Sequence, residues 1–391
     1  MYKVLTLNNI ALAGLRRFPR ERYEVASEIT HPDAIILRSY NMHDMDIPET
    51  VAAVGRAGAG TNNIPVEALS KRGVPVFNAP GANANAVKEL VIAALMIGAR
   101  NLCDASHYVR HLKETGEALS KKVEAGKKQF VGFELPGRTL GVVGLGAIGV
   151  EVANAALALG MHVIGFDPKI TVRRAWQLDS GVAHAETLDQ LFKKADAVTV
   201  HVPLTDDTRG LVNRTRMALM NDGALLINFA RGGVVDDEAA LAALESGKLH
   251  AYVSDFPTEA LIAHPKVVAL PHLGASTGEA EENSAVMVVD QLRDYLEHGN
   301  LRNAVNFPEA AMAREAPYRL AIANANVPDM LARISHAMGE RGINIHNMLN
   351  KSRRELAYTL VDVDSPVPEP ALAALRGIDG VLAVRYLPLE P

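Results

Sequence analysis

The feature that most constrains this chain is an alternation of short apolar runs with segments of helix length. Runs typical of buried strands cover residues 34–37, 51–54, 74–77, 140–143, 162–166, 197–200, 224–227 and 267–270. Strands that are apolar on both faces are typical of parallel sheets covered by crossover helices. The pattern predicts an α/β chain with two doubly wound parallel-sheet (Rossmann-like) domains, for which 391 residues suffice.

Two apolar helices indicate that the first domain is discontinuous in sequence. Residues 86–102 form a nearly all-apolar helix, and residues 283–298 place Val286, Val289, Leu292 and Leu296 at helical spacing. Such helices can carry the chain out of a domain and back into it. We expect a first domain at residues 1–92 and 283–308, and a second at residues 93–282.

A linker at residues 306–317 precedes a different pattern. The chain then reads strand 318–324, helix 328–340, strands 343–350 and 355–363, helix 369–376 and strand 380–387. This βαββαβ order predicts a ferredoxin-like domain at residues 317–391.

Composition and charge argue against several classes of protein. The net charge of −5 is spread without long runs, and the lysines at 121–122 and 127–128 lie beside Glu117 and Glu124, as on a solvated helix face. The N-terminus reads as a strand and a short turn, and no apolar run reaches the length of a membrane span. Cys103 is the single cysteine, which fits a reducing compartment. We expect a cytoplasmic protein with no nucleic-acid or membrane partner and no metal.

A glycine fingerprint follows the strand at 140–143. Gly144, Gly146 and Gly149 stand as Gly-x-Gly-x-x-Gly, a helix follows, and Asp167 ends the next strand 18 residues after the last glycine. Glycines at these positions allow a tight turn and let a pyrophosphate approach a helix N-terminus. Asp167 alone would be a turn residue before a proline, but after this fingerprint a carboxylate on the adenosine ribose is the better interpretation. It favours NAD over NADP, although Lys169, Arg173 and Arg174 lie downstream.

Three further polar groups come just after predicted strands, where open α/β sheets bind ligands. They are Arg231, Glu259 and His272. A histidine can take a hydroxyl proton near neutral pH, a glutamate can hold its other ring nitrogen, and an arginine can clamp a carboxylate. Each residue taken alone would be an ordinary loop or surface residue; beside a dinucleotide fingerprint, a coincidence of all three is improbable.

With these motifs, the chain resembles the D-2-hydroxyacid dehydrogenase family from about residue 34 onward. Within it, the resemblance is to the branch that oxidises 3-phospho-D-glycerate with NAD. It implies that Arg231, Glu259 and His272 are catalytic. It also implies cofactor contacts at Gly144, Gly146, Ala147, Ile148, Gly149, Asp167, His201, Val202, Pro203, Ala230, Asp255 and Gly274. The family commonly has Asp-Val-Phe where this chain has Ser254-Asp255-Phe256, so Asp255 needs a one-residue adjustment to bind the nicotinamide carboxamide.

The resemblance also assigns residues to the substrate and to an effector. Substrate binding falls to Arg38, Ser39, Gly58, Ala59 and Asn83. Lys88 stands where many relatives have a small residue, and its partner is either a substrate phosphate or an acid such as Glu89. The C-terminal segment resembles an ACT domain, which implies a homo-oligomer and a candidate L-serine site at Asn324, Asn326 and Asn344. The family often has His at the position of Asn324 and Gly at that of Asp329.

Two alternatives remain open at this stage. One is another NAD-dependent D-2-hydroxyacid dehydrogenase with a different side-chain pocket. The other is a non-catalytic NAD(H)-sensing scaffold, which the presence of the three catalytic residue types does not exclude.

Overall fold

A computed structural model describes residues 1–389. The chain divides into two compact units, of which the first combines Met1–Ala82 with the chain from Glu281 onward and the second is Asn83–Ala280. The first unit is therefore discontinuous, and the C-terminal sheet is grouped with it. The separate domain at residues 317–391 and the predicted boundaries stay predictions.

The N-terminal part of the first unit is built on a parallel sheet. Its strands run in the order β2 (Tyr23–Ala26), β1 (Tyr2–Leu7), β3 (Ala34–Leu37), β4 (Ala53–Arg56) and β5 (Val76–Phe77). Two short helices accompany it, α1 (Leu12–Leu15) and α2 (Val66–Lys71). Helix α12 (Gly278–His298) packs against this sheet through Ala285, Val288, Val289 and Leu292, which are fully buried. The apolar spacing in residues 283–298 arises from this contact.

The C-terminal part of the first unit is a four-stranded antiparallel sheet. The strand order is β14 (Ile345–Arg353), β15 (Leu356–Val363), β13 (Tyr318–Ala325) and β16 (Val381–Pro388). Helices α13 (Met330–Gly339) and α14 (Glu369–Arg376) cover one face, where Ile334 and Leu375 pack on Leu320 and Val361. The predicted ferredoxin-like arrangement is confirmed, with each element within three residues of its expected bounds.

The other face of this sheet packs on the C-terminal end of α12. Ala321, Tyr358 and Leu360 share a buried cluster with Leu292 and Leu296. The last carbonyls of the helix accept hydrogen bonds from the sheet: Arg385 donates to the oxygens of Tyr295 (2.8 Å) and Leu296 (3.0 Å), Arg319 to that of His298 (3.1 Å), and Tyr358 to that of Gly299 (2.7 Å). The Tyr295 carbonyl also accepts from the Gly299 N–H (2.8 Å) and the Leu296 carbonyl from the Tyr2 hydroxyl (2.7 Å), so the sheet adds donors at a helix end where backbone bonding is incomplete.

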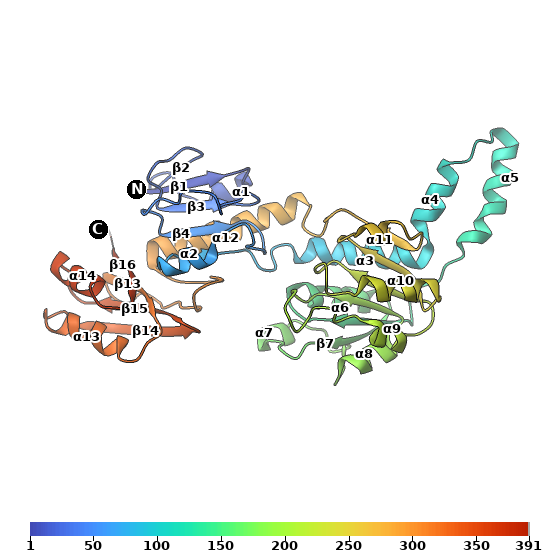
Figure 1. The fold of residues 1–391 in the computed structure, drawn as a ribbon. Helices are drawn as coiled ribbons and strands as arrows, with labels where there is room; N and C mark the ends of the chain where they lie inside the picture. Colours follow the sequence, from blue (N-terminus) through green and yellow to red (C-terminus); the bar gives the residue numbers. More distant parts are fainter. Residues whose placement is uncertain (390–391) are drawn as a thin grey trace. The chain divides into compact units, whose positions relative to one another are not determined.

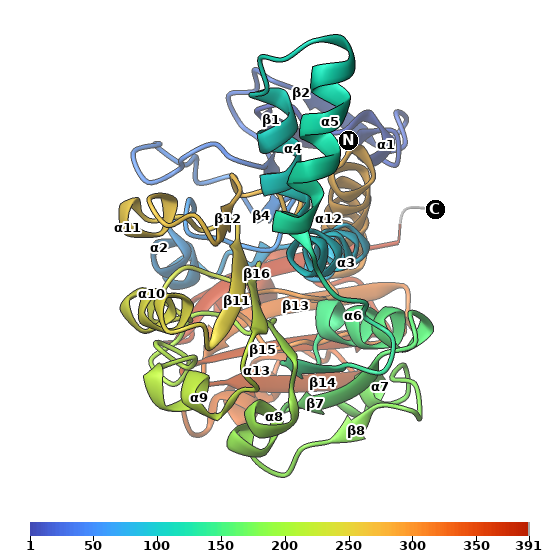
Figure 2. The ribbon, with the colours of Figure 1, turned by 90° about the vertical axis from the view of Figure 1, so that its right-hand side faces the viewer.

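The second unit is a seven-stranded parallel sheet with helices on both faces. Its strands run in the order β12 (Val267–Ala269), β11 (Leu249–Ser254), β10 (Ala224–Asn228), β9 (Ala197–Val200), β6 (Thr139–Val143), β7 (His162–Phe166) and β8 (Ala183–His184). Figure 2 shows α9 (Arg214–Leu219) and α10 (Asp237–Glu245) on one side of the strands. On the other side lie α3 (Ala84–Arg100) and α6 (Ala147–Ala158). The predicted α/β fold class is confirmed for both units.

Shorter helices complete the second unit. They are α7 (Val172–Ala175), α8 (Leu188–Lys194) and α11 (Glu259–Ile262). Helices α4 (Leu102–Arg110) and α5 (Gly116–Gly126) project from the rest of the unit and are followed by a 3₁₀ turn at Lys127–Phe130 (Figure 1). Among residues 1–389, no helix is both long enough and apolar enough to cross a membrane.

Candidate functional site

The carboxyl ends of six strands meet in one row at the edge of the second unit's sheet. The strand register pairs Phe166 with Val143, Val143 with Val200, Val200 with Asn228, Asn228 with Ser254, and Ser254 with Ala269. The residues that follow these positions therefore come together although they are far apart in sequence. They include the glycine fingerprint, Asp167, His201, the segment before Arg231, Asp255 and the segment before His272. Strand order reverses between β6 and β9, which is where such sheets bind dinucleotides.

The glycine fingerprint has the shape that a pyrophosphate requires. Gly144 has φ +91°, and a Cβ there would lie 2.7 Å from the His201 carbonyl oxygen. A Cβ on Gly149 would lie 1.9 Å from the Gly144 oxygen, so α6 can pack this closely on the loop only with glycine. Gly146 faces open space and caps α6 without a side-chain hydrogen bond. The first amides of this long helix thus point at a space that a phosphate can enter.

Asp167 and His201 flank this loop. The Asp167 Oδ2 accepts from the backbone N–H of Leu145 (2.9 Å) and its Oδ1 from that of Lys169 (2.8 Å), which fixes the carboxylate beside the fingerprint. The His201 Nε2 lies 3.0 Å from the Thr199 hydroxyl, while its Nδ1 is buried with no hydrogen-bond partner in residues 1–389. Burial lowers the pKa of His201 to about 3, so its imidazole is neutral at physiological pH. Val202 and Pro203 continue the chain directly after it.

Arg231 is held through its backbone by a residue that sequence reasoning missed. Asn228, the buried last residue of β10, donates from Nδ2 to the Arg231 carbonyl (3.0 Å) and accepts at Oδ1 from the Ala230 N–H (3.1 Å). The Arg231 guanidinium bonds only to the adjacent Ala230 carbonyl (2.7 Å) and forms no ion pair within the described residues. Its remaining donors are open to a carboxylate. Asn228 could have been found in the sequence as a polar residue at the end of an otherwise apolar strand.

His272 and Glu259 are both exposed in the second unit. The His272 ring lies 4.7 Å from that of Phe256, tilted by 51°. Glu259 opens α11, and no hydrogen bond or ion pair joins it to His272 within residues 1–389. The histidine–glutamate contact that the residue types suggest is therefore not made in this state, and the catalytic assignment of Glu259 stays a prediction.

Asp255 lies directly behind the His272 loop. Its Oδ2 accepts from the backbone N–H groups of Leu273 (3.0 Å) and Gly274 (3.1 Å). The side chain is 1% exposed, and Oδ1 has no hydrogen-bond partner in the described chain. Burial raises the pKa of Asp255, while the amides of Gly274 and Leu273 and the nearby His272 favour the ionised form.

The substrate residues predicted in the first unit lie on two neighbouring loops. Asn63, which sequence reasoning did not single out, joins these loops by donating to the carbonyls of Arg38 (3.2 Å) and Tyr40 (2.7 Å), while Arg56 donates to its Oδ1 (3.1 Å). Arg38 also pairs with Glu281 at 2.5 Å. The Gly58–Ala59 turn is fixed by a hydrogen bond from Asn78 to the Ala59 carbonyl (2.6 Å). Ser39 directly follows Arg38, so the hydrogen bonds of Asn63 keep the Arg38–Ser39 loop beside the loop that contains Gly58 and Ala59.

Two other predicted residues belong to the start of α3. Asn83 is its N-cap and makes no side-chain capping bond. Lys88 lies on the same stripe of the helix as the buried Val87 and Val91, and its side chain is 21% exposed. Its Nζ is 4.0 Å from Glu89 Oε1, which also accepts from Asn85 at 2.9 Å. Glu89 is thus a partner at the outer limit of an ion pair, and the phosphate alternative stays open.

The three C-terminal asparagines do not share one site within a single chain. Asn324 is buried, donates to the Ala325 carbonyl (2.8 Å) and accepts from the Thr359 hydroxyl (3.3 Å). Asn326 is exposed and bonds to the Arg354 carbonyl (2.9 Å), whereas Asn344 bonds to Asp364 (2.6 Å) at the opposite end of the sheet. The strand register separates these ends by the full length of β15.

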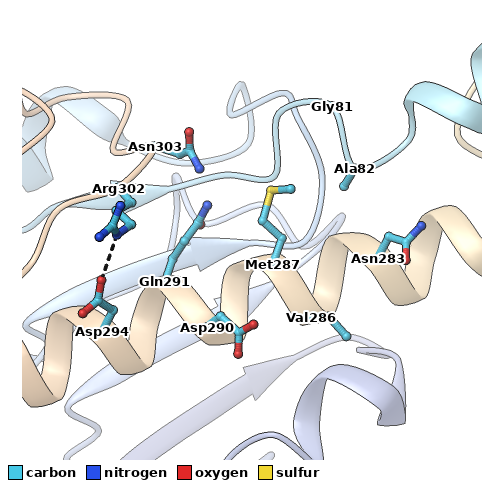
Figure 3. A pocket seen from close by; sticks show the side chains of 10 residues that line it. All are labelled: Gly81, Ala82, Asn283, Val286, Met287, Asp290, Gln291, Asp294, Arg302 and Asn303. Carbon is cyan, nitrogen blue, oxygen red and sulfur yellow. Dashed lines mark hydrogen bonds and ion pairs between the residues drawn. The ribbon is translucent and has the colours of Figure 1, made fainter. Parts of the chain in front are cut away.

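A pocket of about 750 Å³ in the first unit lies apart from these residues (Figure 3). One face of α12 forms its floor, with Asn303 and Arg302 opposite. Asp290 is paired with Arg17 and Asp294 with Arg302, and none of the predicted site residues lines it. We assign this pocket no part in the reaction. Residues 1–389 also hold no group of three or more His, Cys, Asp or Glu side chains arranged to bind a metal ion.

The fold and the edge of its larger sheet define a class: an α/β protein with a dinucleotide site at the switch point and an arginine and a histidine nearby. Comparison with known proteins agrees. Residues 99–274 match the family model described as D-isomer specific 2-hydroxyacid dehydrogenase, NAD binding domain. Among solved structures, the NAD⁺-bound 3-phosphoglycerate dehydrogenase of Entamoeba histolytica superposes with a TM-score of 0.59 at 24% identity, over 78% of this chain and 98% of that one. At that identity the likeness concerns the fold.

Two curated relatives extend the match beyond the cofactor domain. A D-3-phosphoglycerate dehydrogenase of Escherichia coli K12 is 33% identical over 87% of this chain and 82% of its own length. One from Methanocaldococcus jannaschii is 36% identical over 76% of this chain, and the match spans only 56% of that relative. This chain belongs to the D-isomer specific 2-hydroxyacid dehydrogenases, and the predicted cofactor, NAD, is confirmed.

Proposed function

We propose that this protein is a D-3-phosphoglycerate dehydrogenase, which oxidises 3-phospho-D-glycerate to 3-phosphohydroxypyruvate with NAD and so supplies L-serine biosynthesis in the cytoplasm. The observation that carries the proposal is the single row of strand ends that brings the fingerprint, Arg231 and His272 to one sheet edge. The naming of the curated relatives supports the choice of substrate.

The residues of this chain divide the work of the reaction. Bound NAD supplies the hydride acceptor. Asp167, with its carboxylate fixed beside the fingerprint, binds the ribose hydroxyls and repels the phosphate of NADP. Arg231 holds the substrate carboxylate with the donors that its backbone contact leaves open. His272 takes the proton of the C2 hydroxyl, and Glu259 stabilises the resulting imidazolium once the two side chains meet.

The remaining predicted contacts complete the proposal. On the cofactor side they are Gly144, Gly146, Ala147, Ile148, Gly149, His201, Val202, Pro203, Ala230 and Gly274, and on the substrate side Arg38, Ser39, Gly58, Ala59 and Asn83. The role of Asp255 is taken up below.

The regulatory part of the proposal has a separate basis. We infer a homo-oligomer because α4 and α5 project from the second unit and expose Leu102, Val109 and Val123. An L-serine site needs a second copy of the C-terminal sheet, since Asn326 and Asn344 lie at opposite ends of one sheet. Asn324, which is buried and bonded on both sides of its amide, supports the fold of that site rather than touching the ligand.

The experiment that separates this proposal from its alternatives is a panel of 2-hydroxy and 2-keto acids assayed with NAD(H) and NADP(H). We expect turnover of 3-phosphoglycerate and 3-phosphohydroxypyruvate, with NAD strongly preferred. Good turnover of an unphosphorylated acid alone would identify a different dehydrogenase of the family. Tight NADH binding without turnover of any acid would identify a cofactor-sensing scaffold.

A further inference from the structure

The His272 loop is attached to the sheet through one carboxylate. The two backbone amides that follow His272, those of Leu273 and Gly274, both donate to Oδ2 of Asp255. Asp255 is the first residue beyond β11, so a strand that is paired on both sides fixes the position of this oxygen. A shift of the carboxylate would move the backbone beside His272 directly.

The side chains of the adjacent residues Ser254 and Asp255 lie on opposite faces of the sheet. Tyr252 belongs to the core on the α10 side and Val253 to the core on the α3 side, so the alternation sends Ser254 to the first and Asp255 to the second. The Ser254 hydroxyl accepts from the Phe256 N–H at 3.1 Å. A Cβ on Gly274 would lie 3.3 Å from the Val87 side chain on α3, so the loop packs tightly on the same side of the sheet as Asp255.

A buried charge at this position is costly to keep. Asp255 is almost fully buried, and its Oδ1 meets no donor in residues 1–389. A neutral asparagine has the same shape, can accept a hydrogen bond from the loop, and would avoid the cost of burying a carboxylate. Burial therefore opposes the charge on Asp255, while the two loop amides and the nearby His272 favour it.

We propose that Asp255 is a positioning residue for His272: its Oδ2 sets the backbone of the loop, and its charge favours the imidazolium that forms when His272 accepts the substrate proton. This assignment rests on the proposed role of His272 as the base. It replaces the expectation that Asp255 binds the nicotinamide carboxamide, because the oxygen that points to the loop is already used and the other is buried.

The test compares Asp255→Ala, Asp255→Asn and Asp196→Ala. Asp196 is the matched control, because its Oδ2 also accepts from a backbone amide (Thr139, 2.8 Å). Asp196 directly precedes β9, so it lies at the amino-terminal ends of the strands, away from the proposed site. We expect Asp255→Ala to lower kcat roughly 10- to 100-fold, the scale of a misplaced catalytic group. Asp255→Asn should lose less. In both variants the Kd of NADH, measured by fluorescence, should stay within about twofold of wild type. Asp196→Ala should keep kcat and lose thermal stability instead.

Two further readouts separate a failed inference from a failed function. Hydrogen exchange of the 272–277 segment should become faster in Asp255→Ala, whether or not the protein turns over any acid. Asp255→Asn should melt at or above the wild-type temperature at pH 8, since burial disfavours the charge. A wild-type protein inactive on every acid would refute the proposed function alone. If the wild-type protein is active and Asp255→Ala keeps the wild-type kcat, the positioning role is overturned. The same holds if Asp255→Ala keeps kcat but binds NADH tenfold or more weakly, since Asp255 would then serve the cofactor.

Discussion

At the residue scale, the proposed chemistry depends on two exposed side chains whose backbones are held by neighbouring residues. Asn228 fixes Arg231 and Asp255 fixes the loop of His272, which leaves the guanidinium and the imidazole exposed for a ligand. Catalytic side chains that are oriented by packed neighbours bind the transition state without reorganising. The neighbours are as much a part of the site as the groups that react.

Substitution of the two exposed groups should separate proton transfer from substrate binding. His272→Ala should reduce kcat by roughly 10²–10⁴-fold, the usual contribution of a general base. Arg231→Ala should raise the KM of the acid, because the carboxylate clamp is lost, while the Kd of NADH stays unchanged. Steady-state kinetics and a fluorescence titration of NADH measure both. Wild-type kinetics in both variants would remove these residues from the mechanism.

His201 makes the folding stability depend on pH. Burial lowers its pKa to about 3, from 6.5 in the unfolded chain. The folded state thus binds fewer protons than the unfolded state between these values, and the free energy of unfolding falls as pH drops from 6.5 towards 3. The slope from this group is at most about 1.4 kcal/mol per pH unit. Urea unfolding at pH 7, 6 and 5 should show a shallower decline for His201→Gln than for wild type; equal declines would mean that folding does not lower the pKa of His201.

At the element scale, the C-terminal end of α12 is where the C-terminal sheet attaches to the rest of the first unit. Arg319 and Asp362 form an ion pair with no exposed surface at 2.5 Å, and Arg319 also donates to the carbonyls of His298, Met312 and Ala313. Tyr358 and Arg385 add further bonds to the same turn. The sheet therefore supplies donors at the helix end, where backbone bonding alone leaves carbonyls incompletely satisfied.

Breaking the Arg319–Asp362 ion pair should destabilise the contact between the C-terminal sheet and α12. Arg319→Met leaves the Asp362 carboxylate buried and unpaired, which should cost about 3–5 kcal/mol. The double variant Arg319→Met/Asp362→Leu should regain only part of the loss, because the three backbone carbonyls remain unpaired. Arg376→Met is the control, since its partner Glu369 is exposed and such a pair contributes at most about 1 kcal/mol. Urea titrations give all three values; a loss no larger than that of the control would contradict the structural role.

Elements were predictable where their periodicity is local. Strands 197–200 and 162–166 and helix 369–376 match their predicted bounds, because burial on both faces or on one stripe leaves a clear pattern. Strands β2 and β8 were missed, since both are short: β8 is exposed, and β2 fully buries only Tyr23. Asp329, where the resemblance to an ACT domain implies Gly, has φ +67°. A left-handed position favours glycine, so the backbone accounts for the glycine that the resemblance implies, which the sequence alone could not show.

The site was predictable as a set of residue types and not as a set of contacts. The fingerprint is recognisable in sequence because a side chain at Gly144 or Gly149 would clash with the backbone. The partners of Asn228, Asn63 and Asp255 depend on which strands are neighbours and which face each side chain takes. A one-residue slip between Ser254 and Asp255 changes the face, and no local pattern fixes that choice.

At the scale of the whole molecule, the C-terminal sheet cannot be removed without damage. It shares a buried cluster with α12 and the first parallel sheet through Ala321, Tyr358 and Leu360. A truncation near Glu309 would expose that cluster, so loss of assembly in such a chain would not distinguish unfolding from loss of an interface. Intact protein is the proper object for any test of assembly or regulation.

Calorimetry and mass measurement on the intact chain test the regulatory proposal. L-serine should release or absorb heat on binding, D-serine serves as the matched control, and Asn344→Ala should abolish the signal. Val109→Glu places a charge on projecting helix α4 and should shift the assembly towards the monomer, because charges are disfavoured in the core of an interface. No heat from L-serine would remove the effector site; an unchanged mass of the variant would remove α4 from the interface.

The central claim is that this chain uses NAD, Arg231 and His272 to oxidise a phosphorylated 2-hydroxy acid. The most direct measurement is NADH formation from NAD and 3-phospho-D-glycerate, with D-glycerate assayed beside it and the product trapped to pull the reaction forward. We expect steady NADH formation from the phosphorylated acid and loss of turnover in His272→Ala. The kcat/KM for 3-phospho-D-glycerate should be at least about tenfold higher than for D-glycerate, which corresponds to about 1.4 kcal/mol of added transition-state binding. Equal or better use of D-glycerate, or NADH formation that survives His272→Ala unchanged, would contradict it.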